Sequence, residues 1–272
     1  MWDWSELASS IKTIFVVLCF CISLTAIESV EAKEATFTVC YENIENIPYY
    51  YGEGSEVPKA RAGLYVDMFE VVSVKLALKI SFHRAPWARC LKRLELNQVD
   101  GVLAASYKPE RAVYSHYPMS FGAVDMERRI VNKAYFLYRR KGSSVSWDGD
   151  NFQGIKVVGA QIGYAVIDFL RKYNVTVMET ASVQRGFKQL QNQRLEGFAT
   201  LEAVGNTLLM RYPDQYNMIE KVPTALSIKP YYLLIGTEFY KNHESLSEDI
   251  WNTLAQIRET DMTTLLVPYT EQ

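Results

Sequence analysis

The sequence has no block of basic residues, and its charges are nearly balanced. It contains 29 Lys and Arg against 31 Asp and Glu, which gives a formal net charge of -2. The balance stays close to zero when residues 1–32 are left out. Binding to nucleic acid or to an anionic membrane surface needs a concentrated positive field. We therefore predict neither a nucleic-acid partner nor electrostatic attachment to a membrane.

Motifs for catalysis and metal binding are also missing. No two of the three histidines, His83, His116 and His243, lie three or four residues apart, so no helical pair can bind a metal. The sequence contains no Cys-x-x-Cys, Gly-x-Ser-x-Gly, P-loop or Gly-x-Gly-x-x-Gly pattern. We therefore expect no cofactor, no metal site and no catalytic residue, although a triad built from distant residues would leave no such motif.

Long hydrophobic runs are absent except for Ile14–Ile27. This run is short for a membrane-spanning helix, which needs about 20 apolar residues. It is followed by Val30-Glu31-Ala32, a typical cleavage pattern of a signal peptide. We expect residues 1–32 to be a signal peptide and the mature protein to be soluble and periplasmic. The segment before the run carries two acids and one lysine, which is unusual for a signal peptide, so an uncleaved anchor is the alternative.

Cysteine is scarce, with four residues in the chain, and Cys19 and Cys21 fall within the expected signal peptide. Cys40 and Cys90 would remain, and two thiols in an oxidising compartment can pair. In the chain-entropy model a disulfide closing this loop would stabilise the fold by about 4 kcal/mol. Two buried, unpaired thiols are the alternative.

From Thr36 onward, short β-branched and aromatic runs alternate with helical periodicity, which is typical of βαβ units and predicts an α/β fold. Asp67, followed three residues later by Glu70, predicts a capping box for a helix that begins near Met68. Strands are expected at Thr36–Tyr41, Lys79–His83, Asp100–Ala105, Tyr135–Arg140, Lys156–Gly159, Gly197–Leu201 and Tyr231–Gly236. Further helices are expected at Trp87–Leu96, Tyr164–Tyr173, Gln184–Gln193 and Ser245–Leu266.

The most informative stretch is DGVLAASYKPERAVYSHYPMS, from Asp100 to Ser120. An expected strand runs into Ser106 and then into a turn that ends at Glu110-Arg111. This order resembles the ligand-binding loop of the type 3 periplasmic solute-binding proteins of amino-acid ABC transporters, in which Asp and a strand precede Thr/Ser-x-Thr-x-Glu-Arg. Lys108 stands where the second Thr would be.

The resemblance covers most of the chain after residue 32. Its other elements are Gly63-x-x-x-Asp67, Trp87, Phe152-Gln153-Gly154-Ile155-Lys156-Val157, Gln161-Ile162-Gly163-Tyr164 and Arg194-Leu195-Glu196. It implies a periplasmic binding protein type II-like fold, with two α/β lobes joined by a two-strand hinge that bends on ligand binding. Lobe 1 would comprise residues 33–122 and 232–272, and lobe 2 residues 123–231. The protein is expected to be a monomer.

The same resemblance implies a role for Arg111, Ser106 and Trp87. A guanidinium presents a planar fork of donors that matches the two oxygens of a carboxylate, and the Ser106 hydroxyl can add a donor. Trp87 would cover one face of the ligand. The alternatives are a solvated Arg111 paired with Glu110 and a Trp87 that belongs to the core.

Further ligand contacts are implied by position. Gly163 and Tyr164, at an expected helix start, could offer free N–H groups to an anion, unless they form a simple turn. Glu202 is the nearest acid for a ligand ammonium, but it lies one residue beyond the expected place, so either the strand differs or the ligand lacks an α-amine. Glu42 and Tyr49 would face the same cleft, the alternatives being a solvated acid and a packed tyrosine.

Together these features predict a periplasmic solute-binding protein. It would capture a small polar ligand, amino-acid-like or carboxylate-bearing, for the membrane permease of an ABC-type transporter. Two alternatives stay open. One is an enzyme on the same fold, similar to prephenate or arogenate dehydratases, which would need a general acid tuned by its cleft. The other is a periplasmic sensor module.

Overall fold

A computed structural model describes residues 36–270, so the predicted signal peptide lies outside the described residues. The sheet has nine strands, in the order β11-β10-β12-β7-β13-β3-β1-β2, with β4 paired to β13. Its strands are β1 (Thr36–Glu42), β2 (Lys79–Ala85), β3 (Gly101–Ser106), β4 (Ser115–His116), β7 (Val131–Arg140), β10 (Val157–Gln161), β11 (Thr176–Thr180), β12 (Gly197–Leu201) and β13 (Ile219–Gly236). Two small hairpins join β5 (Met119–Ser120) to β6 (Ala123–Val124), and β8 (Ser146–Trp147) to β9 (Phe152–Gln153).

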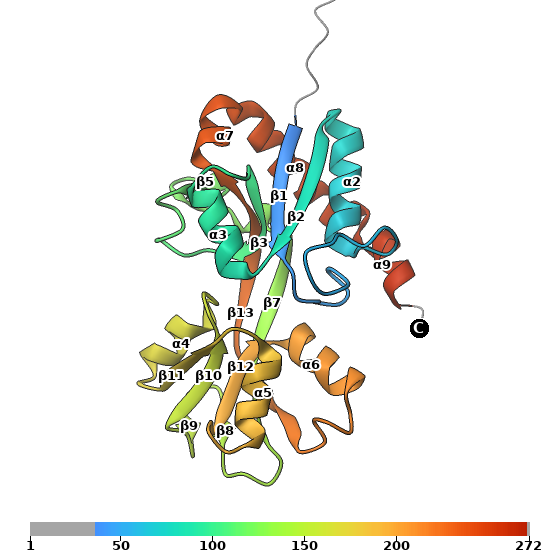
Figure 1. Cartoon of the computed structure of the whole chain (residues 1–272). Coiled ribbons are helices and arrows are strands. Elements are labelled where there is room, and N and C mark those ends of the chain that lie inside the picture. The colour runs from blue at the N-terminus through green and yellow to red at the C-terminus, as the bar shows by residue number, and fades with distance from the viewer. Residues whose placement is uncertain (1–35, 271–272) are drawn as a thin grey trace, which may run out of the picture. The chain divides into compact units, whose positions relative to one another are not determined.

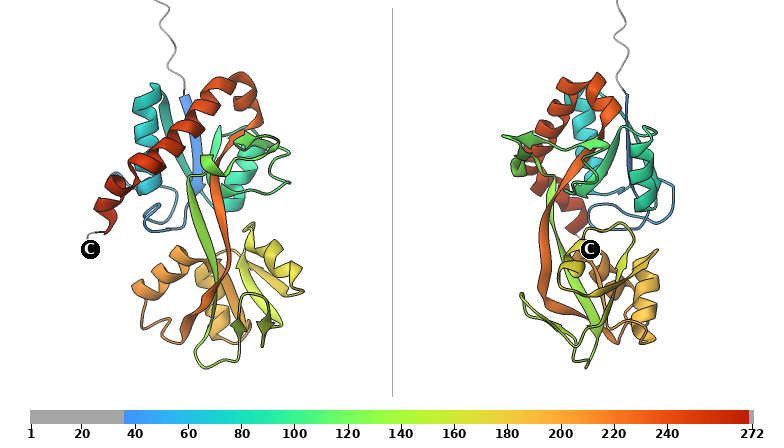
Figure 2. Two further views of the ribbon diagram at one scale, coloured as in Figure 1. Left: turned by 180° about the vertical axis from the view of Figure 1, so that it is seen from behind. Right: turned by 90° about the vertical axis from the view of Figure 1, so that its left-hand side faces the viewer.

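Helices cover both parts of the sheet (Figure 1). They are α2 (Leu64–Leu76), α3 (Trp87–Glu95), α4 (Val166–Lys172), α5 (Val183–Gln191), α6 (Glu202–Arg211), α7 (Thr237–Asn242), α8 (Glu244–Thr260) and α9 (Met262–Thr270), with a short 3₁₀ helix at Met126–Arg128. Helix α2 packs against α8, and α5 packs on β10 and β12. In the view from behind, Figure 2 shows α8 crossing in front of the strands that α2 and α3 flank.

Two sets of parallel strands lie on either side of a long antiparallel pair. β1 pairs in parallel with β2 and β3, and β10 pairs in parallel with β11 and β12. β7 and β13 pair with each other and extend through both sets (Figure 1). The first set and its helices form the first lobe, and the second set forms the second lobe. This confirms the predicted fold class of two α/β lobes joined by two strands; the residue bounds given for the lobes stay a prediction.

The capping box predicted before α2 is wrong. The helix begins at Leu64, and its N-cap residue, Gly63, makes no side-chain capping bond. Gly63 has φ 120°, and a Cβ there would lie 2.4 Å from the Cα of Tyr50. Close backbone approach therefore sets this helix start. Asp67 instead accepts a hydrogen bond from the Tyr269 hydroxyl at 2.6 Å, which ties α2 to the C-terminal helix.

The largest difference from the expected elements is the length of β13. It begins at Ile219, whereas the sequence pattern indicated a start at Tyr231. Pro223 and Pro230 interrupt the strand pattern, because proline cannot donate to a ladder. The pairing with β7 shifts register between Lys221 and Ala225, which accommodates the first proline outside regular pairing.

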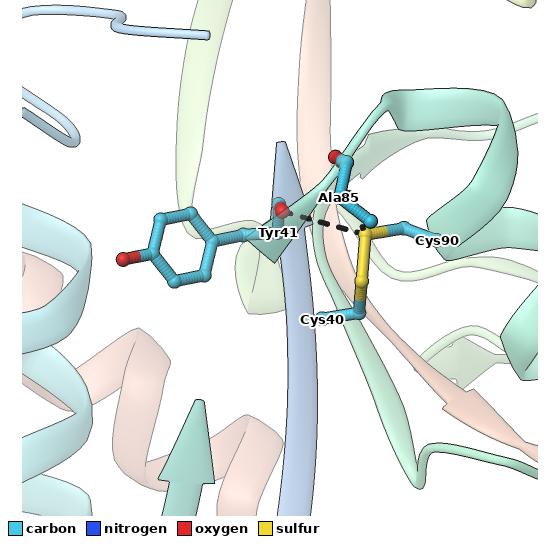
Figure 3. Close-up of a disulfide and its surroundings, with 4 residues drawn as sticks. All are labelled: Cys40, Tyr41, Ala85 and Cys90. Atoms are coloured by element: carbon cyan, nitrogen blue, oxygen red, sulfur yellow. Dashed lines mark hydrogen bonds between the residues drawn. A yellow bond between two sulfur atoms is a disulfide. The ribbon is translucent and has the colours of Figure 1, made fainter. Parts of the chain in front are cut away.

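A disulfide joins Cys40 in β1 to Cys90 in α3, with the two Cα atoms 5.5 Å apart (Figure 3). Cys90 Sγ also lies 3.4 Å from the carbonyl oxygen of Tyr41. A thiol could donate along this line, but a disulfide sulfur carries no hydrogen, so the oxidised protein has only a contact there. The bond fixes the end of β1 to the helix that begins with Trp87.

Candidate functional site

A small, partly open cavity lies where β1, β3 and β12 end and β7 and β13 pass between the lobes. In open α/β sheets ligands bind beyond the carboxyl ends of the strands, and this cavity has that position. It is lined by Glu42, Tyr50, Trp87, Ala104, Ser106, Arg111, Lys133, Tyr135, Tyr164, Ala165, Leu201 and Tyr231. Both lobes and both connecting strands contribute.

Arg111 is buried in the wall of this cavity, 3% exposed. Its guanidinium donates to the carbonyl oxygen of Ser106 at 2.8 Å and to that of Gly163 at 2.9 Å. Its carbon lies 5.5 Å from the Trp87 ring centroid, within the range of a cation–π contact. Arg111 is therefore neither solvated nor paired with Glu110, which forms an ion pair with Lys108 at 2.8 Å instead.

The residues next to Arg111 hold the turn after β3 in place. The Ser106 carbonyl accepts a second hydrogen bond, from the Tyr117 hydroxyl at 2.9 Å. Ser115 Oγ donates to the Arg111 carbonyl at 2.7 Å. Lys108, at the position where the resemblance has Thr, forms a 2.7 Å ion pair with Asp168 in α4. The turn is thereby fixed both within its lobe and across to the second lobe.

Trp87 of the first lobe is in direct contact with Gly163 of the second lobe. Trp87 Nε1 donates to the Gly163 carbonyl at 3.3 Å, and that oxygen also accepts from Arg111. Helix α4 begins at Val166 and not at Tyr164, and the Tyr164 N–H donates to the Gln161 carbonyl. Gly163 thus offers a carbonyl at this point, and the Tyr164 N–H is not free for a ligand.

Glu42 is the acid at the end of β1, and it is buried, 4% exposed. Gln161 Nε2 donates to Oε1 at 2.7 Å, and the Tyr164 hydroxyl donates to Oε2 at 2.5 Å. The Tyr50 hydroxyl lies 3.4 Å from Oε2. Burial raises the pKa of Glu42 to about 7, although the Tyr164 bond and the charge of Lys133 oppose the rise. Glu42 is therefore not the solvated loop acid of the alternative interpretation.

Lys133 lies on β7 and is 6% exposed. Its Nζ lies 4.4, 5.6, 5.1 and 5.4 Å from the ring centroids of Tyr49, Tyr50, Tyr65 and Tyr231. Burial lowers the pKa of Lys133 to about 7, and the charge of Glu42 partly offsets the decrease. Sequence reasoning missed this residue because the strand was expected to begin at Tyr135. Period-two alternation places Lys133 and Tyr135 on one face, and that signal could have identified both.

Two predicted ligand contacts lie outside this cavity. Glu202 forms an ion pair with Lys221 and borders a neighbouring hollow. Tyr49 lines the same hollow and stacks on Tyr65, with ring centroids 4.9 Å apart. Leu201 occupies the position at which an acid was expected, and it borders both spaces. Within the cavity, Glu42 is therefore the carboxylate that could meet a ligand ammonium.

Two kinds of feature are absent from the described part of the chain. Among residues 36–270, no group of three His, Cys, Asp or Glu side chains could hold a metal ion. No helix in this range combines the length and hydrophobicity that are needed to cross a bilayer. His116 stacks on Tyr240, with ring centroids 4.0 Å apart, and lies outside the cavity.

Comparison with solved structures identifies the fold. A histidine kinase sensor domain with similarity to periplasmic binding proteins has a TM-score of 0.69 and 14% identity, over 88% of this chain and 97% of that one. The substrate-binding protein of an amino acid ABC transporter has a TM-score of 0.65 and 15% identity, over 88% and 100%. The GluR0 ligand-binding core from Nostoc punctiforme, in complex with L-glutamate, has a TM-score of 0.64 and 16% identity, over 87% and 100%. No family model and no curated protein matches the chain.

Proposed function

We propose that this chain is a solute-binding protein whose two lobes close on a small carboxylate-bearing ligand. The observation that carries the proposal is Arg111, a permanently charged guanidinium that is almost fully buried at a cavity between the lobes. Its two hydrogen bonds go to backbone carbonyls, and no ion pair to it is found among residues 36–270. A buried charge without a counter-charge is costly, and a ligand carboxylate would supply that counter-charge.

The ligand would be held from several sides. Arg111 would bind the carboxylate, Ser106 would add a hydroxyl donor, and Trp87 would cover an apolar face. Glu42 would accept from an amine or hydroxyl. Because the Gly163 carbonyl now takes donors from both Arg111 and Trp87, ligand entry would require a small opening of the lobes. Hinge bending along β7 and β13 would provide it.

Export and delivery complete the proposal. The exported protein would work in the periplasm and pass its ligand to the permease of an ABC transporter. The amino-acid ABC transporter protein among the similar structures supports this role by its fold. A sensor role is the second candidate, since a histidine kinase sensor domain shares the fold over 88% of this chain. Ligand capture is common to both roles.

A thermal-shift screen tests ligand capture. Purified protein lacking residues 1–32 would be heated with each of the common L-amino acids and with small mono- and dicarboxylic acids. A ligand at 100 times its dissociation constant should stabilise the protein by about 2.7 kcal/mol. At least one carboxylate should raise the melting temperature, and Arg111→Ala should reduce that rise to about a third or less. A complete screen without any shift would contradict the proposal.

A further inference from the structure

Lys133 is a buried lysine in the wall of the cavity, and it has no ion-pair partner among residues 36–270. It is 6% exposed, and among residues 36–270 no hydrogen bond or ion pair to its Nζ is found. Its charged neighbour is Glu42, which acts on it at a distance and is bound to other donors. Buried charges in proteins are ordinarily paired or bound to a metal. Lys133 therefore has the properties of an anion-binding group.

The surroundings of Lys133 direct it toward the cavity. Four tyrosine rings, from the loop after β1, from α2 and from β13, lie within 5.6 Å of Nζ. These rings stabilise an ammonium through cation–π contacts and exclude water from its sides. Lys133 itself lines the cavity, together with Tyr135 from the same face of β7. Lys133 also borders the neighbouring hollow, where the acid Glu202 is already paired with Lys221. The cavity is therefore the side on which Lys133 still needs an ion-pair partner.

The cavity holds an excess of positive charge. Its charged side chains are Arg111, Lys133 and Glu42. Both oxygens of Glu42 already accept hydrogen bonds, from Gln161 and Tyr164. Leu201 stands where a further acid was expected, and Glu202 is paired with Lys221 outside the cavity. One carboxylate at Arg111 would leave Lys133 unpaired.

We propose that the ligand is a small diacid, with one acidic group at Arg111 and the second at Lys133. This inference rests on the proposed function and specifies its ligand class. Neutral and basic amino acids would leave Lys133 unpaired. The positive charge of a basic side chain would also repel the Lys133 ammonium. The diacid can carry an amine, which Glu42 would accept, or can lack one. The chemistry shared by both forms is the pair of anionic groups.

Calorimetric titration of the protein lacking residues 1–32 with three probes tests the inference. L-glutamate and L-glutamine have the same shape, and one has an amide in place of the second carboxylate. Glutarate keeps both carboxylates and lacks the amine. At least one diacid should bind roughly 30-fold or more tightly than L-glutamine, because an unpaired buried charge is costly. Glutarate then shows whether the amine is required.

Variants at Lys133 assign the difference to this residue. Lys133→Met should remove the preference for the diacid over L-glutamine, and Lys133→Gln should do the same if the methionine variant does not fold. The control is Lys141→Met, at the exposed turn after β7, which should keep the wild-type ratio. The melting temperature of each variant without ligand shows whether it is folded.

The outcomes separate this inference from the proposed function. If L-glutamine or another neutral or basic amino acid binds more tightly than every diacid, the diacid assignment is overturned and ligand capture is left intact. An unchanged diacid preference in folded Lys133→Met would also overturn it. If none of the three probes binds, the diacid assignment falls; if no carboxylate in the thermal-shift screen binds either, the proposed function falls with it.

Discussion

Gln161 Nε2 donates to Glu42 Oε1 at 2.7 Å, and this bond joins the last residue of β10 to the last residue of β1. The Tyr164 hydroxyl makes a second bond to the same carboxyl group. Both bonds connect the two lobes at the bottom of the cavity. The protonation state of one buried acid therefore bears on how firmly the ligand-free lobes are held together.

Stability should fall as pH rises between about 4.5 and 7. Burial raises the pKa of Glu42 from 4.5 to about 7 in the folded protein, so the folded state binds more protons than the unfolded state in this interval. Glu42→Gln cannot titrate and should lack this component. We expect the melting temperature of the wild type, relative to Glu42→Gln, to fall by at least about 2 °C from pH 5 to pH 7.

Scanning calorimetry of both proteins in one buffer series measures this difference. The relative melting temperature should change little above about pH 8, where Glu42 is mostly ionised in both states. A relative melting temperature that rises between pH 5 and pH 7 would contradict the assignment of a protonated, buried Glu42.

Gly163→Ala should weaken ligand binding more than it weakens the fold. Gly163 has φ 77°, and a Cβ there would lie 3.3 Å from Trp87 Cδ1 at the contact between the lobes. Gly142 has a similar φ of 74°, but a Cβ there would meet nothing within 4 Å. The left-handed conformation should cost each alanine variant about 1 kcal/mol of stability.

Gly142→Ala is therefore the matched control for Gly163→Ala. We expect similar losses in the free energy of unfolding from urea titrations of both variants, and a loss of affinity for the screened ligand in Gly163→Ala only. Equal affinities in the two variants would show that the Trp87–Gly163 contact has no part in closure.

Loss of the disulfide should lower the free energy of unfolding while the fold is kept. The bond closes a loop with a sequence separation of 50, which corresponds to about 4 kcal/mol in the chain-entropy model. Cys40→Ala/Cys90→Ala, and reduced wild type, should both unfold at lower urea concentration. Thiol titration of denatured, unreduced periplasmic protein that lacks residues 1–32 should find no free thiol; two thiols per chain would contradict the bond.

The fold class could be predicted because the motif from Ser106 to Arg111 and the alternation of strands and helices are local properties of the sequence. The resemblance implied that Arg111, Trp87 and Glu42 face one cleft, and all three line the cavity. Strand alternation could place Lys133 on one face with Tyr135, but it could not show that tyrosines from three other segments surround it. The role of Glu202 was inferred from its position alone. The residue that lines the cavity at the end of β12 is Leu201, one position earlier.

The proposed capture of a carboxylate depends most on Arg111, so the removal of this side chain is the most direct test. The compound that gives the largest shift in the thermal-shift screen would be titrated by calorimetry into the wild type and three variants, Arg111→Ala, Arg111→Lys and Arg185→Ala. Arg185 is exposed on α5, and its variant should bind like the wild type. Truncating one member of a buried charge pair costs about 2–5 kcal/mol, so Arg111→Ala should bind roughly 30- to 4000-fold more weakly, with partial recovery in Arg111→Lys. Equal affinities of wild type and Arg111→Ala would contradict the account.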